Sequence, residues 1–233
     1  MPSIVYLIPT VLYEGETETL PSYLIDAVKQ CSIFFVENER TARRNLKLSW
    51  KEMVIDNYSW VNIKEITPDV ITTFRSSIKE NKQIGIISEA GCPGIADPGQ
   101  HLVEIAHEMN VQVKPLVGPN SILLALMASG MNGQQFSFLG YLPIEQSERL
   151  KKIKAIESDS RSKQSTQIFI ETPYRNNQML DTLLQACHPK TKLCIAADLT
   201  SKTEFISTKT IEQWKQKKPE LHKRPAIFLL LAS

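Results

Sequence analysis

Hydrophobic positions in the first half of the chain alternate between two periods. Three short apolar runs are typical of strands buried on both faces, and they lie at residues 4–8, 33–36 and 84–87. Amphipathic segments with helical spacing lie between and after these runs. Alternation of strand and helix predicts an α/β fold with a mostly parallel sheet.

Capping signals place two helices of this half. Thr67 precedes Pro68, and a threonine cap followed by proline in the first turn predicts a helix start. The apolar residues of this helix then share one face: Val70, Phe74 and Ile78. A second helix is predicted from Pro98, and a strand at residues 111–117 follows it.

The second half predicts another α/β unit, with a mixed sheet. Residues 122–128 are apolar on all sides, which predicts a buried helix near a domain boundary. Strands are predicted at residues 136–139, 168–171, 193–197, 204–207 and 226–231, and helices at 146–158 and 173–187, the latter with Pro173 in its first position. With 233 residues, the chain is expected to form two domains, 1–118 and 119–233.

Composition narrows the class of protein. The chain is 42% hydrophobic and 22% charged, and no apolar run approaches the roughly 20 residues that cross a bilayer. The first residues read as a strand and lack the basic start of a signal peptide, so a cytoplasmic location is expected. The four cysteines form no CxxC pair, which argues against a metal site and a disulfide framework.

Charge is distributed unevenly between the halves. Residues 1–118 hold 11 Lys and Arg against 15 Asp and Glu, whereas residues 119–233 hold 16 against 10. A basic half is typical of a partner rich in phosphate, although lysine-rich helix faces are equally common as plain solvated surface. Charge alone leaves both interpretations open.

The segment 85–99 has the pattern of a ligand-binding loop. A strand leads into a run rich in glycine and proline, in which Gly91 and Gly94 permit positive φ, and a helix follows. The run lacks the lysine of a phosphate-binding loop and is not GxGxxG. An uncharged or cationic ligand therefore fits better, since Glu89 or Asp97 tolerates a positive charge. A tight structural connection is the alternative.

The same segment resembles a known signature. Residues 88–99, SEAGCPGIADPG, resemble the S-D-A-G-T-P-x-I-S-D-P-G motif of ribosomal RNA cytidine 2′-O-methyltransferases, a branch of the tetrapyrrole methylases. Further similar segments follow this order along nearly the whole chain: VENERT at 36–41, PLVGPNS at 115–121, ASG at 128–130, FLGYLP at 138–143, ETPYR at 171–175 and AADLT at 196–200.

The resemblance implies two α/β domains with S-adenosylmethionine bound in the cleft between them, and a homodimer. It implies cofactor contacts at Ser88, Glu89, Gly91, Ile95, Ala96, Asp97, Asn120, Ser121, Thr172, Pro173 and Leu199. Some of these residues also have structural explanations, because Ser121 and Asp97 each precede a predicted helix as capping residues do.

Methyl transfer to a ribose hydroxyl requires positioning and removal of a proton. Candidate bases are Glu37, Glu171 and, if burial lowers its pKa, Lys202. Candidate contacts to RNA phosphates are Arg40, Arg149, Lys151, Lys152 and Arg175. Of these, Arg149, Lys151 and Lys152 are expected on the outer side of one helix, where a solvated face is the alternative.

The chain departs from the family pattern at its amino end. The usual P-T-P-I-G-N-L-x-D loop becomes PTVLYEGETE at residues 9–18, with three glutamates that repel phosphate. Smaller departures are Asn38, Glu89 and Ala197, which replace Asp, Asp and Arg. The leading hypothesis is an rRNA 2′-O-methyltransferase; the alternatives are a methyltransferase for another hydroxyl or a small molecule, and a non-catalytic module that binds S-adenosylmethionine.

Overall fold

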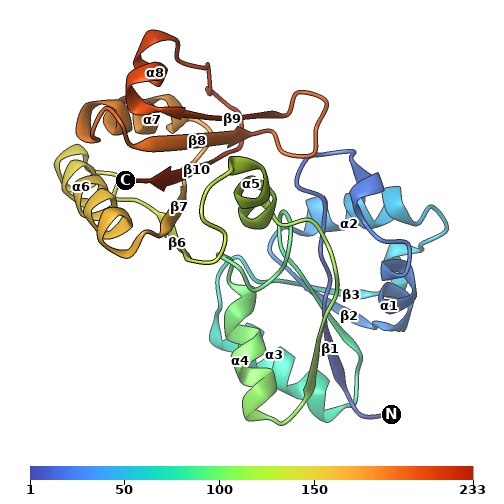
Figure 1. Cartoon of the computed structure of the whole chain (residues 1–233). Helices are drawn as coiled ribbons and strands as arrows, with labels where there is room; N and C mark the ends of the chain where they lie inside the picture. Colours follow the sequence, from blue (N-terminus) through green and yellow to red (C-terminus); the bar gives the residue numbers. More distant parts are fainter. Residues whose placement is uncertain (233) are drawn as a thin grey trace. The chain divides into compact units, whose positions relative to one another are not determined.

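The computed structural model describes residues 1–232, which divide into two compact units, residues 1–120 and the residues from Ser121 onward (Figure 1). The first unit is built on a five-stranded sheet. Its strands are β1 (Ile4–Leu7), β2 (Ile33–Val36), β3 (Ser59–Asn62), β4 (Ile84–Ile87) and β5 (Gln112–Pro115). They lie in the order β3-β2-β4-β1-β5, and every pairing is parallel, as predicted.

Helices cover both faces of this sheet. They are α1 (Leu24–Gln30), α2 (Glu39–Ser49), α3 (Pro68–Lys79) and α4 (Gly99–Glu108), with short 3-10 turns at Thr17–Thr19 and Ile55–Asn57. Side chains alternate along the strands, so Val5 packs in one core with α3 and α4, and Tyr6 packs in the other with α1. The Thr67 cap is confirmed, because its Oγ1 accepts the N–H of Val70 at 3.3 Å.

The order of the strands reverses after β3, because the chain moves from β1 through β2 to the edge strand β3 and then back to β4 and β5. The connections after β1 and β2 run through α1 and α2 on one face, whereas the connection after β4 runs through α4 on the other. Neighbouring parallel strands whose connections leave to opposite faces form a topological switch point, where ligands of α/β sheets bind. The carboxyl ends of β1, β2 and β4 are therefore the expected binding edge.

The second unit contains a mixed sheet, as predicted. Its strands are β6 (Phe136–Tyr141), β7 (Thr166–Ile170), β8 (Lys192–Ala197), β9 (Phe205–Thr210) and β10 (Ala226–Leu231). In the order β6-β7-β10-β8-β9, only β6 and β7 are parallel. The helices are α5 (Ser121–Ser129), α6 (Gln146–Lys163), α7 (Asn176–Ala186) and α8 (Ile211–Gln216). The rings of Phe169 and Phe228 stack at 5.8 Å in the core beneath α6 and α7.

Two details of this unit differ from expectation. Pro173 does not begin a helix, because residues 173–175 form a turn and α7 starts at Asn176. The α5 helix is not buried all round, since the side chains of Leu123 and Met127 are exposed. Local sequence alone determines neither where a helix starts nor how fully it is buried, because both depend on what packs against the segment.

Candidate functional site

Two chain segments meet at the carboxyl edge of the first sheet. The backbone N–H of Thr10, which follows β1, donates to the carbonyl oxygen of Gly91 at 2.9 Å, and the two residues form an isolated antiparallel bridge. The Thr10 hydroxyl in turn accepts a hydrogen bond from the buried Asn45 amide of α2 at 2.8 Å. The loop after β4 is thus tied to the loop after β1.

Residues 88–99 form a tight loop of unusual backbone conformation. Gly91 and Gly94 have φ of 73° and 84°, and Ala96 has φ of 58° without being glycine. A Cβ on Gly91 would lie 3.1 Å from Leu12 Cδ2 and 3.3 Å from the Pro119 carbonyl oxygen. Left-handed non-glycine residues cost energy and collect at functional sites. The loop therefore has the geometry of a preformed binding segment.

Asp97 closes the loop from inside. Its two carboxylate oxygens accept the backbone N–H groups of Gly94 at 2.8 Å and Gly99 at 2.7 Å. Burial raises the pKa of the Asp97 carboxyl, and the bonds from Gly99 and Gly94 oppose that rise. Gly99 is the first residue of α4, whose N-cap is Pro98, so Asp97 also accepts a backbone N–H at the start of that helix. Ser88 is buried nearby, and its hydroxyl bonds the carbonyl of Ala90 at 3.3 Å.

A second carboxylate lies at the end of β2. Glu37 Oε2 accepts the backbone N–H of Glu89 at 2.8 Å, and the Asn38 amide donates to Glu89 Oε1 at 3.3 Å. Burial raises the pKa of the Glu37 carboxyl; the Glu89 N–H opposes this rise, and the charges of Asp97 and Glu89 add to it. Glu37, Glu89 and Asp97 thus form one group of acidic side chains, which suits a cationic ligand.

The second unit carries its predicted residues on two segments. After β7, the Glu171 carboxylate is fully buried. Its Oε1 atom accepts hydrogen bonds from the Arg175 guanidinium at 2.6 Å and from the N–H of Thr172 at 2.6 Å. Within residues 1–232, Glu171 Oε2 has no partner. Thr172 and Pro173 lie half-buried in the same turn. Glu171 is therefore held as an ion pair.

Leu199 and Lys202 lie in the loop between β8 and β9. Leu199 is buried, and the two residues beside it, Asp198 and Thr200, have φ of 50° and 72°. Lys202 is exposed. The hypothesis that Lys202 is a base required burial, so the structure removes its physical basis. Of the remaining cofactor candidates, Ile95 is exposed, whereas Asn120 and Ser121 are half-buried.

The expected basic surface is corrected at one position. The prediction that Arg149 lies on the outer side of α6 is wrong, because its side chain is 1% exposed and bonds Thr182 Oγ1 at 3.3 Å and the Ile144 carbonyl at 3.0 Å. It shares the inner face of α6 with Ile153, four residues on. Lys151 and Lys152 are exposed, and Lys151 pairs with Glu148 at 2.8 Å. Arg40 is exposed at the start of α2.

The acidic first loop is partly neutralised. Glu14 pairs with Arg44 of α2 at 2.7 Å, although both side chains are well exposed. Neither this ion pair nor the hydrogen bond from Asn45 to Thr10 was predicted from the sequence, where the one indication of such contacts was the spacing of polar residues along α2.

Within residues 1–232, no helix is long and apolar enough to span a membrane, and no cluster of three His, Cys, Asp or Glu forms a metal site.

Comparison with curated proteins identifies relatives across most of the chain. Ribosomal RNA small subunit methyltransferase I of Bacillus subtilis is 30% identical over 210 residues, which cover 90% of this chain and 68% of the relative. The protein of the same name from Vibrio cholerae is 30% identical over 206 residues, covering 87% and 67%. No protein-family model matches the chain.

Solved structures share the fold at lower identity. The methyltransferase CobJ aligns with a TM-score of 0.65 and 15% identity, over 100% of this chain and 94% of its own. Uroporphyrin-III C-methyl transferase from Thermus thermophilus, complexed with S-adenyl homocysteine, aligns with a TM-score of 0.57 and 16% identity, over 97% and 96%. These likenesses establish the architecture, in agreement with the predicted α/β class.

Proposed function

From the finding that the chain belongs to the ribosomal RNA small subunit methyltransferase I family, and is an S-adenosylmethionine-dependent methyltransferase, we propose that it methylates the 2′-hydroxyl of a cytidine ribose in small-subunit ribosomal RNA. The observation that carries this proposal is the order of the matched segments together with the acidic, glycine-containing loop at the switch point of the first sheet.

The loop 88–99 fits the methyl donor. It contains no Lys or Arg, and the carboxylates of Glu37, Glu89 and Asp97 gather at its base. A sulfonium is a cation, so this charge favours it, and glycines at 91 and 94 let backbone approach the ligand. The proposed contacts in this unit are Ser88, Glu89, Gly91, Ile95, Ala96, Asp97 and Asn120. Those in the second unit are Ser121, Thr172, Pro173 and Leu199.

When bound, S-adenosylmethionine supplies an electrophilic methyl group. The chain has to hold the acceptor oxygen in line with that group and take the proton that the hydroxyl loses. We assign the proton to Glu37, because its raised pKa makes the carboxylate a stronger base than an ordinary glutamate. Glu171 is engaged with Arg175 and Lys202 is exposed, so each is less suited to this role.

Exposed cations are proposed to hold the RNA. Arg40 begins the helix that follows Glu37, and Lys152 lies exposed on α6. Lys151 and Arg175 are already paired with carboxylates; an exposed pair such as Lys151–Glu148 contributes little and exchanges readily for a phosphate. Arg149 is withdrawn from this set, because it is buried.

A homodimer in the cytoplasm completes the proposal. Leu123 and Met127 of α5 and Ile144 are exposed large apolar side chains, which a second copy of the chain would cover. The proposed location is consistent with the four cysteines, which are free thiols.

The test is transfer of tritiated methyl from S-adenosylmethionine to small ribosomal subunits that lack the modification. Free cytidine and a reaction without substrate are run beside them, and nuclease digestion with mass spectrometry locates the methyl group. Label on a cytidine ribose of the subunit is the expected result. Label on a base, or on free nucleoside alone, indicates another acceptor, which the glutamates of residues 14–18 favour by repelling phosphate. Cofactor binding without any transfer indicates a non-catalytic module.

A further inference from the structure

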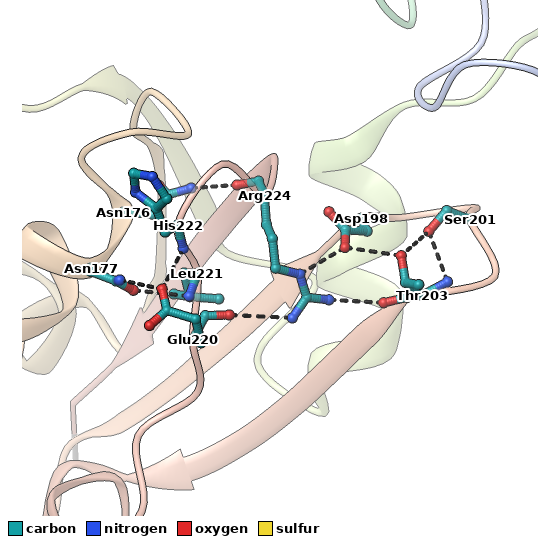
Figure 2. Close-up of polar contacts among 9 residues, drawn as sticks. All are labelled: Asn176, Asn177, Asp198, Ser201, Thr203, Glu220, Leu221, His222 and Arg224. Atoms are coloured by element: carbon teal, nitrogen blue, oxygen red, sulfur yellow. Dashed lines mark hydrogen bonds and ion pairs between the residues drawn. The ribbon is translucent and has the colours of Figure 1, made fainter.

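Arg224 joins three separate parts of the second unit (Figure 2). It lies two residues before β10, and its Nε donates to Asp198 Oδ2 at 2.7 Å. Its other nitrogens donate to the carbonyl oxygens of Thr203 at 2.8 Å and Glu220 at 3.4 Å. One guanidinium therefore clamps both ends of the loop between β8 and β9.

The clamp is shielded from water on its acidic side. The Asp198 side chain is 7% exposed and that of Arg224 is 28% exposed. Asp198 Oδ2 also accepts the Thr203 hydroxyl at 3.1 Å, and the Asp198 N–H donates to the Pro225 carbonyl at 2.9 Å. Removing the guanidinium would leave a buried carboxylate with a single weak donor, which is strongly unfavourable.

The segment that carries Arg224 is itself anchored. The Asn176 amide donates to the Arg224 carbonyl at 2.6 Å, and Asn177 Oδ1 accepts the N–H of Leu221 at 2.9 Å. Asn176 and Asn177 are the first residues of α7, directly after the turn that holds Thr172 and Pro173. Figure 2 shows this chain of contacts running from Asn176 to Ser201. Arg224 thus connects the two segments of this unit that are proposed to contact the cofactor.

The clamped loop is held in a costly conformation. Asp198 and Thr200 both have left-handed φ, which non-glycine residues keep only when surrounding contacts enforce it. The Thr200 N–H is satisfied by Glu204 Oε2 at 2.8 Å, yet the Thr200 hydroxyl is buried and has no partner within residues 1–232. A buried hydroxyl without a partner is unfavourable, and a ligand that bonds it relieves that cost.

We propose that Arg224 is a positioning residue, which fixes the β8–β9 loop so that the Thr200 hydroxyl hydrogen-bonds a polar group of bound S-adenosylmethionine. The inference rests on the cofactor of the proposed function and is independent of the methyl acceptor. The ion pair with Arg224 fixes Asp198, and the left-handed φ of Thr200 sets the direction of the Thr200 side chain. Leu199, between these two residues, is held in place as a result.

The experiment measures binding of S-adenosylhomocysteine to the full chain by calorimetry. R224Q removes the clamp, R224K restores a charge and one donor, and T200V removes the hydroxyl while keeping the shape of the side chain. The matched control is K218Q, which breaks the exposed pair of Lys218 with Asp181 in the same unit. Circular dichroism and thermal melting identify which variants are folded at the binding temperature.

R224Q is expected to weaken binding about tenfold or more, T200V about fivefold, and R224K less than R224Q, in line with the loss of hydrogen bonds to a preorganised site. K218Q is expected to bind as the unmodified chain does. Folded R224Q and T200V with unchanged affinity overturn the proposal. If R224Q does not fold, unchanged affinity of both T200V and R224K overturns it equally. Failure of the unmodified chain to bind contradicts the cofactor assignment and is thereby distinguishable.

Discussion

The backbone N–H of Glu89 donates to the carboxylate of Glu37 at 2.8 Å, so the ends of β4 and β2 are joined through one acidic side chain. The bond fixes Glu37 beside the loop proposed to bind the methyl donor. Burial raises the pKa of the Glu37 carboxyl, the bond from the Glu89 N–H opposes this rise, and the charges of Asp97 and Glu89 add to it. The proposed base and the proposed cation-binding group thus lie at the same edge of the sheet.

Glu37→Gln is predicted to abolish methyl transfer while leaving S-adenosylhomocysteine binding within about threefold, because the amide still accepts the Glu89 N–H. In the unmodified enzyme, the rate is expected to fall with decreasing pH as the carboxylate of raised pKa takes up a proton. A pH–rate profile under saturating cofactor measures this fall. Full activity of the amide variant contradicts the assignment of the base.

Glu37→Gln, which is predicted to abolish activity, is also predicted to stabilise the folded chain at neutral pH. A carboxyl whose pKa is raised by folding favours the folded state below its unfolded pKa, and this contribution is lost as pH rises through the folded pKa. The amide variant is therefore expected to melt at a higher temperature than the unmodified chain at pH 7, with a difference that disappears at acidic pH. Melting curves over a pH series test the prediction. A lower melting temperature at pH 7 contradicts it.

Gly91→Val is predicted to remove cofactor binding and to cost about 1–3 kcal/mol of stability, because a β-branched residue is strained at φ 73°. Its Cβ also approaches Leu12 and the Pro119 carbonyl closely. Gly133→Ala is the matched control, since its Cβ would meet nothing within 4 Å. Calorimetry and denaturant unfolding measure both effects. A valine variant that binds like the control shows that this loop does not hold the cofactor.

Arg149 is predicted to act in packing and not in RNA binding. Arg149→Ala is expected to destabilise the chain by about 2–4 kcal/mol through the cavity it leaves, whereas Arg149→Met fills the space and removes a buried charge at little cost. Urea unfolding distinguishes the two variants. The methionine variant is expected to bind small-subunit RNA normally, and loss of RNA affinity in that folded variant is the contrary result.

Lys152→Gln is predicted to weaken RNA binding while stability stays within about 0.5 kcal/mol. If Lys152 contacts a phosphate, the slope of log affinity against log salt becomes shallower by about one. Filter binding over a series of salt concentrations measures the slope. Lys190→Gln, another exposed lysine of this unit, serves as a control, and equal slopes for all three proteins exclude Lys152 from the interface.

Apolar runs predicted most strands, since burial on both faces leaves a continuous hydrophobic stretch at 33–36 and 84–87. The edge strand β3 was missed because Ser59–Asn62 has polar ends and exposed residues. Contacts between residues far apart in the sequence could not be predicted. Arg224 meets Asp198 only because β10 lies beside β8, and nothing in either residue's neighbourhood predicts the other.

Arg149 illustrates a different limit. Adjacent lysines at 151 and 152 suggested a uniformly basic face, yet helical geometry places residue 149 with Ile153 and Ile156 on the inner side. Tracing the buried stripe of α6 backwards from those isoleucines would have placed the arginine inside. Pairing of Glu171 with Arg175 followed from their spacing of four residues only once the turn at 173–175 was known.

The segments that follow β1 and β4 meet at the bridge between Thr10 and Gly91, and Leu12 lies close to Gly91 beside it. Tyr13, Glu14 and Gly15 follow that contact and are exposed, so substitutions at these positions are expected to leave residues 88–99 undisturbed. If these residues face the acceptor, exchanging them between relatives is expected to change the selectivity for the acceptor while the proposed donor site is retained.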